Sequence, residues 1–317
     1  MRAGLRALGV AALLGAAACA AVATTTPLPA GIDRPIRVEA LRTPLGVGGA
    51  RLAPGVRYAG GLTLRGADIR GLSDIKVQDG RAWIVSDFGD LVRFDLVLDG
   101  SGRLVSVQRA VSRPLIGLDG AFLSPKANAD AEGLALLPDG RVLVSFERDH
   151  RIWSYGDGGN DCPSPVASPE LDLPPNAGFE GLSAAPVGWL VLAEGGGARL
   201  CDSGCREVGS SRLAPADGYS FTGVDRDPSG EGWFVVERFY RPLLDMRARV
   251  RRLSAKGELS EPLIELRPPA STDNFEGVAA VATSQGVRLY LLSDDNDNPL
   301  QRTLLLAFDV VRPAPTP

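Results

Sequence analysis

The sequence predicts an all-β protein with the fold of a β-propeller. A short motif that combines a glycine with an acid recurs five times along the chain. Each copy is followed by short apolar runs, which have the length and pattern of strands rather than of amphipathic helices. The 38 glycines and 24 prolines fall between these runs, as expected for many short strands joined by turns.

The motif glycines set the period of the repeat. They are Gly71, Gly133, Gly181, Gly223 and Gly277, and the steps between them are 62, 48, 42 and 54 residues. One four-stranded blade of a propeller takes about 40 to 50 residues, so each step fits one blade. We therefore expect five blades, or six if residues 35–58 or 111–128 contain a blade without the motif.

The strands of the first repeat can be placed in order. We expect the inner strand at 71–77, followed by strands at 81–87, 91–98 and 104–110. Asp79-Gly80 joins the first two strands, and this dipeptide favours a type I′ hairpin turn, in which both central residues have positive φ. Asp139-Gly140 is expected to repeat the turn in the second blade.

The last repeat is short of strands. Residues 288–293 and 303–310 supply its second and third strands, and no strand-like run follows them. Residues 57–64 form a strand-like run before the first motif. We predict that this N-terminal strand completes the last blade and closes the ring, which removes exposed sheet edges.

The N-terminal segment indicates export. Arg2 and Arg6 precede an Ala-rich apolar run, so residues 1–23 are predicted to be a secretory signal peptide. Two processing routes stay open: cleavage after Ala21-Val22-Ala23, or lipidation of Cys19 in the lipobox-like Ala16-Ala17-Ala18-Cys19. We expect a periplasmic protein, an outer-membrane lipoprotein attached through Cys19, or a secreted protein.

The rest of the chain is expected to form one unit. Residues 24–34 are predicted to be a linker, 35–312 a single propeller domain and 313–317 a disordered tail. The net charge of −4 gives no support for nucleic-acid binding. No other apolar stretch approaches 18 residues, which disfavours a transmembrane anchor. We expect a monomer.

The cysteines agree with an oxidising compartment. Cys162, Cys201 and Cys205 remain after processing. Cys201 and Cys205 are close enough to close a small loop, but Cys162 could pair with either, so the pairing stays open. A zinc site is disfavoured, because no second cysteine pair and only one histidine are present.

The repeated acids are expected to meet at one face of the ring. The first strand of a blade lines the central channel and the second runs antiparallel beside it, so the start of one lies next to the end of the other. Both places carry acids here. The predicted ring consists of Asp74, Asp87, Glu132, Glu147, Glu180, Glu194, Asp225, Glu237, Glu276, Asp294 and Asp295.

Carboxylates gathered in one mouth repel one another, and a hard cation relieves that repulsion. Calcium suits oxygen donors of this kind, whereas the scarcity of histidine disfavours softer metals. The predicted metal ligands are Glu132, Glu180, Glu276, Asp74, Asp225, Asp294 and Asp295. The alternative, that individual acids cap turns or pair with arginines, stays open.

Catalytic and substrate-binding roles are predicted for other residues on the same face. Glu147, Glu237 and Asp87 are the candidates for catalytic carboxylates. Arg148, Arg238 and Arg302 are the candidates for binding an anionic group, because guanidinium forks bind phosphate or carboxylate with two hydrogen bonds. His150, the only histidine, is a further substrate-binding candidate. The chain has no G-x-S-x-G motif, which disfavours a serine hydrolase.

Together these motifs resemble the phytase-like family of exported bacterial proteins, described by an esterase-like activity of phytase. The resemblance covers about residues 55–310. It is carried by Asp130-Ala131-Glu132-Gly133-Leu134, Ser145-Phe146-Glu147-Arg148, Gly178-Phe179-Glu180-Gly181-Leu182, Asp273-Asn274-Phe275-Glu276-Gly277-Val278, Leu291-Leu292-Ser293-Asp294-Asp295-Asn296 and Pro299-Leu300-Gln301-Arg302-Thr303. A more distant likeness to lactonase-type propellers implies that Glu132, Glu180 and Glu276 bind a metal.

The resemblance implies hydrolysis of ester or phosphoester bonds. The expected function is therefore that of an exported hydrolase of phosphate or carboxylate esters, dependent on a divalent metal such as calcium and acting on a small anionic ester. Two alternatives stay open, namely a lactonase-type metal hydrolase and a non-catalytic binding propeller of the cell envelope.

Overall fold

The computed structural model describes residues 32–157, 162–174, 177–209, 213–230, 232–241 and 245–311. The predicted signal peptide, Cys19, most of the predicted linker and the predicted tail lie outside this part of the chain. The described residues form a β-propeller with one short helix, α1 (Lys126–Ala129). Within these ranges, no helix combines the length and the apolar character needed to cross a membrane.

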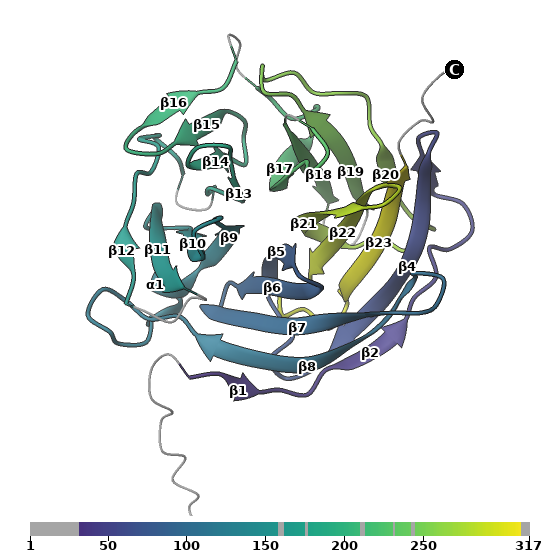
Figure 1. The fold of residues 1–317 in the computed structure, drawn as a ribbon, viewed down its shortest axis with the longest axis horizontal. Coiled ribbons are helices and arrows are strands. Elements are labelled where there is room, and N and C mark those ends of the chain that lie inside the picture. The colour runs from purple at the N-terminus through teal and green to yellow at the C-terminus, as the bar shows by residue number, and fades with distance from the viewer. Residues whose placement is uncertain are drawn as a thin grey trace, which may run out of the picture.

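The described strands form groups of four, arranged around a centre (Figure 1). We name these groups blades 1 to 5. Blade 1 contains β5 (Leu72–Gln78), β6 (Arg81–Ser86), β7 (Asp90–Leu98) and β8 (Leu104–Pro114). Blade 2 contains β9 (Ala131–Leu136), β10 (Arg141–Phe146), β11 (Arg151–Asp157) and β12 (Ser164–Pro165). Blade 3 contains β13 (Gly181–Ala184), β14 (Trp189–Leu192), β15 (Ala198–Cys201) and β16 (Cys205–Glu207).

The remaining two blades complete the ring. Blade 4 contains β17 (Tyr219–Arg226), β18 (Trp233–Arg241), β19 (Asp245–Leu253) and β20 (Ile264–Leu266). Blade 5 contains β21 (Asn274–Thr283), β22 (Gly286–Asp294), β23 (Thr303–Val311) and β4 (Val56–Arg65). The first strands β5, β9, β13, β17 and β21 lie nearest the centre in Figure 1.

The N-terminal strand closes the ring, as the sequence predicts. β4 pairs antiparallel with β23, and the register runs from Thr303 opposite Leu64 to Val310 opposite Val56. β4 also touches blade 1 through one parallel pair, Gly60 with Leu104, so blades 5 and 1 form one continuous sheet.

The segment before β4 adds edge strands. β1 (Arg34–Pro35) pairs with β8, β2 (Glu39–Arg42) with β4, and β3 (Ala50–Leu52) with β20. Residues 35–58 therefore extend the outer edges of three blades. Residues 111–128 hold the end of β8, an isolated bridge between Ile116 and Phe122, and part of α1. Neither segment forms a further four-stranded group within the described residues, and five blades remains our interpretation of this topology.

The core lies between the blades. The buried apolar residues form five clusters, and each is shared by two neighbouring blades. Val85 of blade 1 packs with Leu134 of blade 2, for example, and Ala135 of blade 2 with Leu182 of blade 3. Successive strand residues point to opposite faces, so each blade is buried on both faces. This explains why the strands read as nearly continuous apolar runs.

The two Asp-Gly hairpins differ. Asp79 and Gly80 both have positive φ, 51° and 76°, which confirms the predicted type I′ geometry. Of Asp139 and Gly140 in the second blade, only Gly140 has positive φ, so the predicted repeat of that turn is wrong. Leu137 N donates to Arg141 O at 2.9 Å across three loop residues. The loop is thus one residue longer, and it needs a left-handed residue only at its last position.

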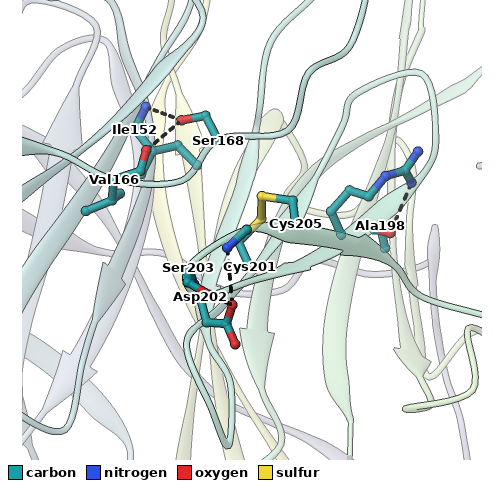
Figure 2. Close-up of a disulfide and its surroundings, with 10 residues drawn as sticks. Ile152, Val166, Ser168, Ala198, Cys201, Asp202, Ser203 and Cys205 are labelled. Carbon is teal, nitrogen blue, oxygen red and sulfur yellow. Dashed lines mark hydrogen bonds between the residues drawn. A yellow bond between two sulfur atoms is a disulfide. The ribbon is translucent and has the colours of Figure 1, made fainter.

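The cysteine pairing that the sequence left open is settled within blade 3. Cys201 and Cys205 form a disulfide, with Cα atoms 4.1 Å apart, across the turn between β15 and β16 (Figure 2). Asp202 Oδ1 accepts hydrogen bonds from Ser203 Oγ at 3.1 Å and Gly204 N at 3.2 Å inside the same turn. Cys162 is free and exposed.

Candidate acidic site at the mouth of the ring

A β-bulge recurs near the start of the first strands. The register shifts leave Ser73, Glu132, Thr222 and Glu276 without a partner on the second strand of their blades. Glu180 precedes β13 at the corresponding place, directly before Gly181. A bulge redirects its side chain. The three glutamates of the E-G motif and Ser73 line one pocket as a result.

This acidic pocket has a volume of about 240 Å³. Its lining contains eight carboxylates and three cationic side chains. It is formed by Ser73, Asp87, Lys126, Asp130, Glu132, Glu147, Arg148, Glu180, Glu194, Arg238, Glu276, Asp294 and Asn296. Seven of the predicted ring acids are therefore together, namely Asp87, Glu132, Glu147, Glu180, Glu194, Glu276 and Asp294.

The ends of the second strands supply the other wall of the pocket. Asp87, Glu147 and Glu194 follow the second strands of blades 1 to 3, and Asp294 ends that of blade 5. In blade 4 the equivalent position is occupied by Arg238. Arg238 pairs with Ser220 of the first strand in the same way that Asp294 pairs with Asn274 in blade 5. Four acids and one arginine thus occupy equivalent positions.

Glu237 lies one residue away from that place and outside the pocket lining. A shift of one residue along a strand moves the side chain to the opposite face. Glu237 is fully buried, and its Oε1 accepts from Ala216 N at 3.2 Å and lies 3.3 Å from Arg251 Nη1. Its carboxylate is placed to support blade 4 rather than to contact a ligand in the pocket.

Asp74 lies deeper in the ring, also outside the pocket lining. It follows the bulge residue Ser73, so it occupies the place of the motif glycines in the other blades. Its carboxylate is fully buried, pairs with Lys76, and accepts from Leu134 N at 2.9 Å in blade 2. Burial raises the pKa of Asp74 to about 7, although Lys76 opposes the shift.

Asp225 and Asp295 also lie outside the pocket lining. Asp225 is near the far end of β17, where Oδ2 accepts from Ala280 N at 2.8 Å and Oδ1 from Ser183 Oγ at 3.2 Å. Asp295 Oδ1 accepts from Gly71 N and Oδ2 from Thr303 Oγ1, each at 3.1 Å. Both carboxylates join neighbouring segments of the ring.

Two of the predicted substrate-binding residues line the acidic pocket, and two do not. Arg148 and Arg238 line the acidic pocket, but Arg302 and His150 do not. Arg302 pairs with Asp273 at 3.3 Å. His150 lies in the loop between β10 and β11, with its Nε2 3.2 Å from Pro174 O.

Sequence reasoning did not single out Asp130, Lys126, Ser73 or Asn296. Asp130 stands two residues before Glu132 in the quoted motif Asp130-Ala131-Glu132, and alternation along a strand puts both on one face. That spacing is the signal that could have found it. Lys126 comes from α1, which has no counterpart among the described residues of the other repeats.

The three cations pair with part of the acids. Arg238 forms ion pairs with Glu276 and, at 3.5 Å, with Glu194, and it donates to Asn274 Oδ1 at 3.0 Å. Lys126 Nζ lies 2.7 Å from Asp87 Oδ2. Arg148 pairs with Asp130.

Of the other four acids, Asp294 accepts only from Asn296 N at 2.8 Å, and three have no partner at all among the described residues. The carboxylates of Glu132, Glu147 and Glu180 form no hydrogen bond or ion pair with any residue in the described ranges. Burial, followed by the neighbouring Glu180, raises the pKa of Glu132 well above its usual range, and burial and Glu276 do the same for Glu180. Burial is also the main cause that raises the pKa of Glu276 to about 7.

The donor set fits a hard divalent cation. Oxygens of Asp130, Glu132 and Glu147 lie within 4.8 Å of one another, close enough to share one ion. All side-chain donors of the pocket are oxygens except the three cations, and the lining contains no histidine or cysteine. Oxygen donors of this kind suit calcium or magnesium. Of the predicted metal ligands, Glu132 belongs to this triad, and Glu147 joins it from the predicted catalytic set.

Comparisons with known proteins place the chain in a sequence family. A family model described as phytase-like, with the esterase-like activity of phytase, matches residues 67–297. A search of curated proteins finds no match. Among solved structures, the chain is similar to the major allergen Mala s 1 of Malassezia sympodialis (15% identity, TM-score 0.44, 84% of this chain and 93% of that chain). It is also similar to a structural-genomics protein of unknown function from Bacteroides thetaiotaomicron (10% identity, TM-score 0.47, 88% of this chain and 72% of that chain).

Proposed function

The chain belongs to the phytase-like family, and on that premise we propose that it is an exported, metal-dependent hydrolase of small anionic esters, phosphate esters above all. The observation that carries the proposal is the acidic pocket, where unpaired carboxylates lie beside arginines at the centre of a propeller. Export to the periplasm, the outer membrane or the medium rests on the sequence of residues 1–23.

Asp130, Glu132 and Glu147 would hold the metal ion, for which we propose calcium. The ion would act as a Lewis acid toward the ester and would neutralise part of the carboxylate charge. Eight carboxylates face three cations in the pocket, so an anionic substrate is repelled until positive charge is added. This charge imbalance is the physical reason to expect metal dependence.

Arg238 and Arg148 would bind the anionic group of the substrate. Arg238 is held in place from two sides by Glu276 and Glu194, so little side-chain entropy is lost when its guanidinium binds an anion. Arg148 lies nearer the solvent, with 47% of its side chain exposed, and can receive the substrate at the rim. These are the roles that the sequence analysis predicts for both residues.

Glu180 is our candidate for the general base. Its carboxylate has no hydrogen-bond partner among the described residues, and a raised pKa makes a carboxylate a stronger base. It would accept the proton of the attacking water. Asp87 is held by Lys126, which suits a positioning role, and Glu237 pairs with Arg251 outside the pocket lining, so we assign it no catalytic role.

The proposal is tested by assaying hydrolysis of p-nitrophenyl phosphate, bis-p-nitrophenyl phosphate and acyl esters in the presence of calcium. The double variant Glu132→Gln/Glu147→Gln should lose at least about 100-fold in kcat/KM. The control Glu39→Gln/Glu258→Gln removes the same charge from exposed sites and should retain full activity. Undiminished turnover in the first variant would overturn the proposal, and a wild-type protein silent across the panel would favour a binding propeller.

A further inference from the structure

A second pocket, on the outer strands of blade 4, has the opposite charge. Its volume is about 280 Å³, and its lining includes Arg51, Arg247, Arg249 and Arg267. Glu265 is the one acid among its described lining residues. We call it the arginine pocket. It shares no lining residue with the acidic pocket.

The strand pattern of blade 4 gathers these arginines. Arg247 and Arg249 alternate along β19 with Ala248 and Val250, which are buried in the core between blades 4 and 5. The arginines must therefore project from the other face of the blade. The register continues that row outward, because Arg249 pairs with Glu265 in β20 and Glu265 pairs with Arg51 in β3.

Aromatic rings fix the guanidinium groups. Tyr219 pairs with Phe239, which pairs with Arg247, so the three side chains share one face. The Arg249 guanidinium lies 4.2 Å from the centre of the Tyr219 ring, and that of Arg247 lies 5.0 Å from the centre of the Phe239 ring. Stacking of this kind holds a guanidinium plane in place while its outer N–H groups stay available.

The arginine pocket has donors left over. The Nε atoms of Arg247 and Arg249 are buried and form no hydrogen bond with any described residue. Arg249 Nε lies 3.2 Å from Glu265 Oε1, but without the geometry of a hydrogen bond, and Arg247 pairs with Asp245 through its Nη2 atom. Two acids thus face four arginines. Because the Nε atoms are closed to solvent, an incoming anion would bind the exposed outer N–H groups of these guanidiniums.

We propose that the arginine pocket binds the phosphate groups of a small soluble oligophosphate. A guanidinium group binds two phosphate oxygens at once. Four arginines line the pocket of about 280 Å³, which is more positive charge than is needed to bind a ligand with a single carboxylate. The site is independent of the proposed hydrolysis. Phe239 follows Arg238 in β18, but the two side chains leave opposite faces of the strand, so the arginine pocket and the acidic pocket are separate.

The test uses inorganic pyrophosphate as the probe and isothermal titration calorimetry as the measurement. The protein is treated with chelator and carries Glu132→Gln/Glu147→Gln, which removes metal-dependent binding at the acidic pocket. Arg247→Gln/Arg249→Gln should weaken binding by at least about tenfold, which corresponds to about 1.4 kcal/mol. The control Arg141→Gln/Arg199→Gln should leave the affinity unchanged. It removes two arginines of similar exposure that are also paired with acids, Asp139 and Glu207.

Two results would overturn the proposal. One is an unchanged affinity in Arg247→Gln/Arg249→Gln, with a folded state verified by circular dichroism. The other is a protein with intact arginines that binds pyrophosphate no more tightly than a Kd of about 1 mM. If Arg247→Gln/Arg249→Gln fails to fold, Arg51→Gln/Arg267→Gln replaces it, and binding should weaken by about threefold. Because no turnover is measured, failure here is distinct from failure of the hydrolase assay.

Discussion

Two sets of buried or half-buried acids lie on or directly before the first strands of this propeller, and they differ in their partners. Asp74 and Asp225 each accept a backbone N–H from the next blade, Leu134 N at 2.9 Å and Ala280 N at 2.8 Å. Glu132 and Glu180, in contrast, have carboxylates without a hydrogen bond to any described residue. Burial of an acid therefore does not by itself mark a reactive site. What marks the acidic pocket is carboxylates that the protein leaves unsatisfied.

The β-bulge separates the two sets. The bulge residue, such as Glu276, points into the pocket, and the next residue packs between neighbouring first strands. That next residue is glycine in four blades, because a Cβ on Gly277 would lie 2.8 Å from Ile75 N and one on Gly223 would lie 2.1 Å from Glu276 O. In blade 1 it is Asp74, whose carboxylate uses the contact to bind blade 2. An acid at the bulge position therefore lines the pocket, whereas an acid one residue later holds two blades together.

The largest effect is expected for Asp74→Ala. The substitution removes the counter-ion of Lys76. The Lys76 side chain is only 5% exposed, so its ammonium group would stay buried without a negative partner. We expect a loss of about 3–5 kcal/mol in the free energy of unfolding, measured by urea denaturation. In metal-free protein Glu132→Gln should cause no loss, because it removes a repelled charge. A loss below about 1 kcal/mol for Asp74→Ala would contradict the structural role of Asp74.

Calcium should stabilise the protein through the acidic pocket alone. At 100 times the Kd, a ligand that binds only the folded state adds about 2.7 kcal/mol, which appears as a higher thermal midpoint. Glu132→Gln/Glu147→Gln should abolish the increase. Ser183→Ala, which removes a hydroxyl hydrogen-bonded to Asp225 at 3.2 Å, should leave it intact. A calcium response that survives the first variant would assign the ion to other residues.

Arg238→Gln should raise KM for a phosphate ester by about tenfold or more, because a charged hydrogen bond to the substrate contributes about 1.5–3 kcal/mol. Steady-state kinetics with saturating calcium measures the change. Arg302→Gln is the matched control, since Arg302 pairs with Asp273 outside the pocket lining. Equal effects of the two substitutions would contradict the division between pocket and framework.

The smallest effect concerns pH. Burial raises the pKa of Glu276 from 4.5 to about 7, so between these values the folded protein binds protons that the unfolded chain has released. Stability of chelator-treated protein should therefore fall as pH rises from 4.5 to 7. The thermal midpoint is expected to decrease by an amount on the order of 3 °C. Glu276→Gln should reduce the slope, and a midpoint that rises over this range would contradict the assignment.

Much of the fold and part of the candidate site could be predicted from the period of the sequence repeat. Apolar runs located the strands, and the unclaimed run at 57–64 indicated ring closure, since a missing strand and a spare strand must pair. The E-G motif brought Glu132, Glu180 and Glu276 together because its glycine has no room for a side chain.

What the sequence did not reveal was the exact position of the bulges. The sequence motif took Gly71 as the glycine of the first repeat and grouped Asp74 with the glutamates, although Asp74 itself occupies the position of the glycine. Alignment on acids likewise favoured Glu237, whereas the register of β18 gives the place to Arg238. Both errors are of one residue, and one residue is enough to turn a strand side chain to the other face.

The pairing of β4 with β23 also constrains the order in which the molecule can form. Residues 56–65 emerge from the ribosome long before their partner, Thr303–Val311. Until then β4 has an unsatisfied row of backbone N–H and C=O groups, and blade 5 is incomplete. The ring can therefore be completed only after synthesis has reached Val311.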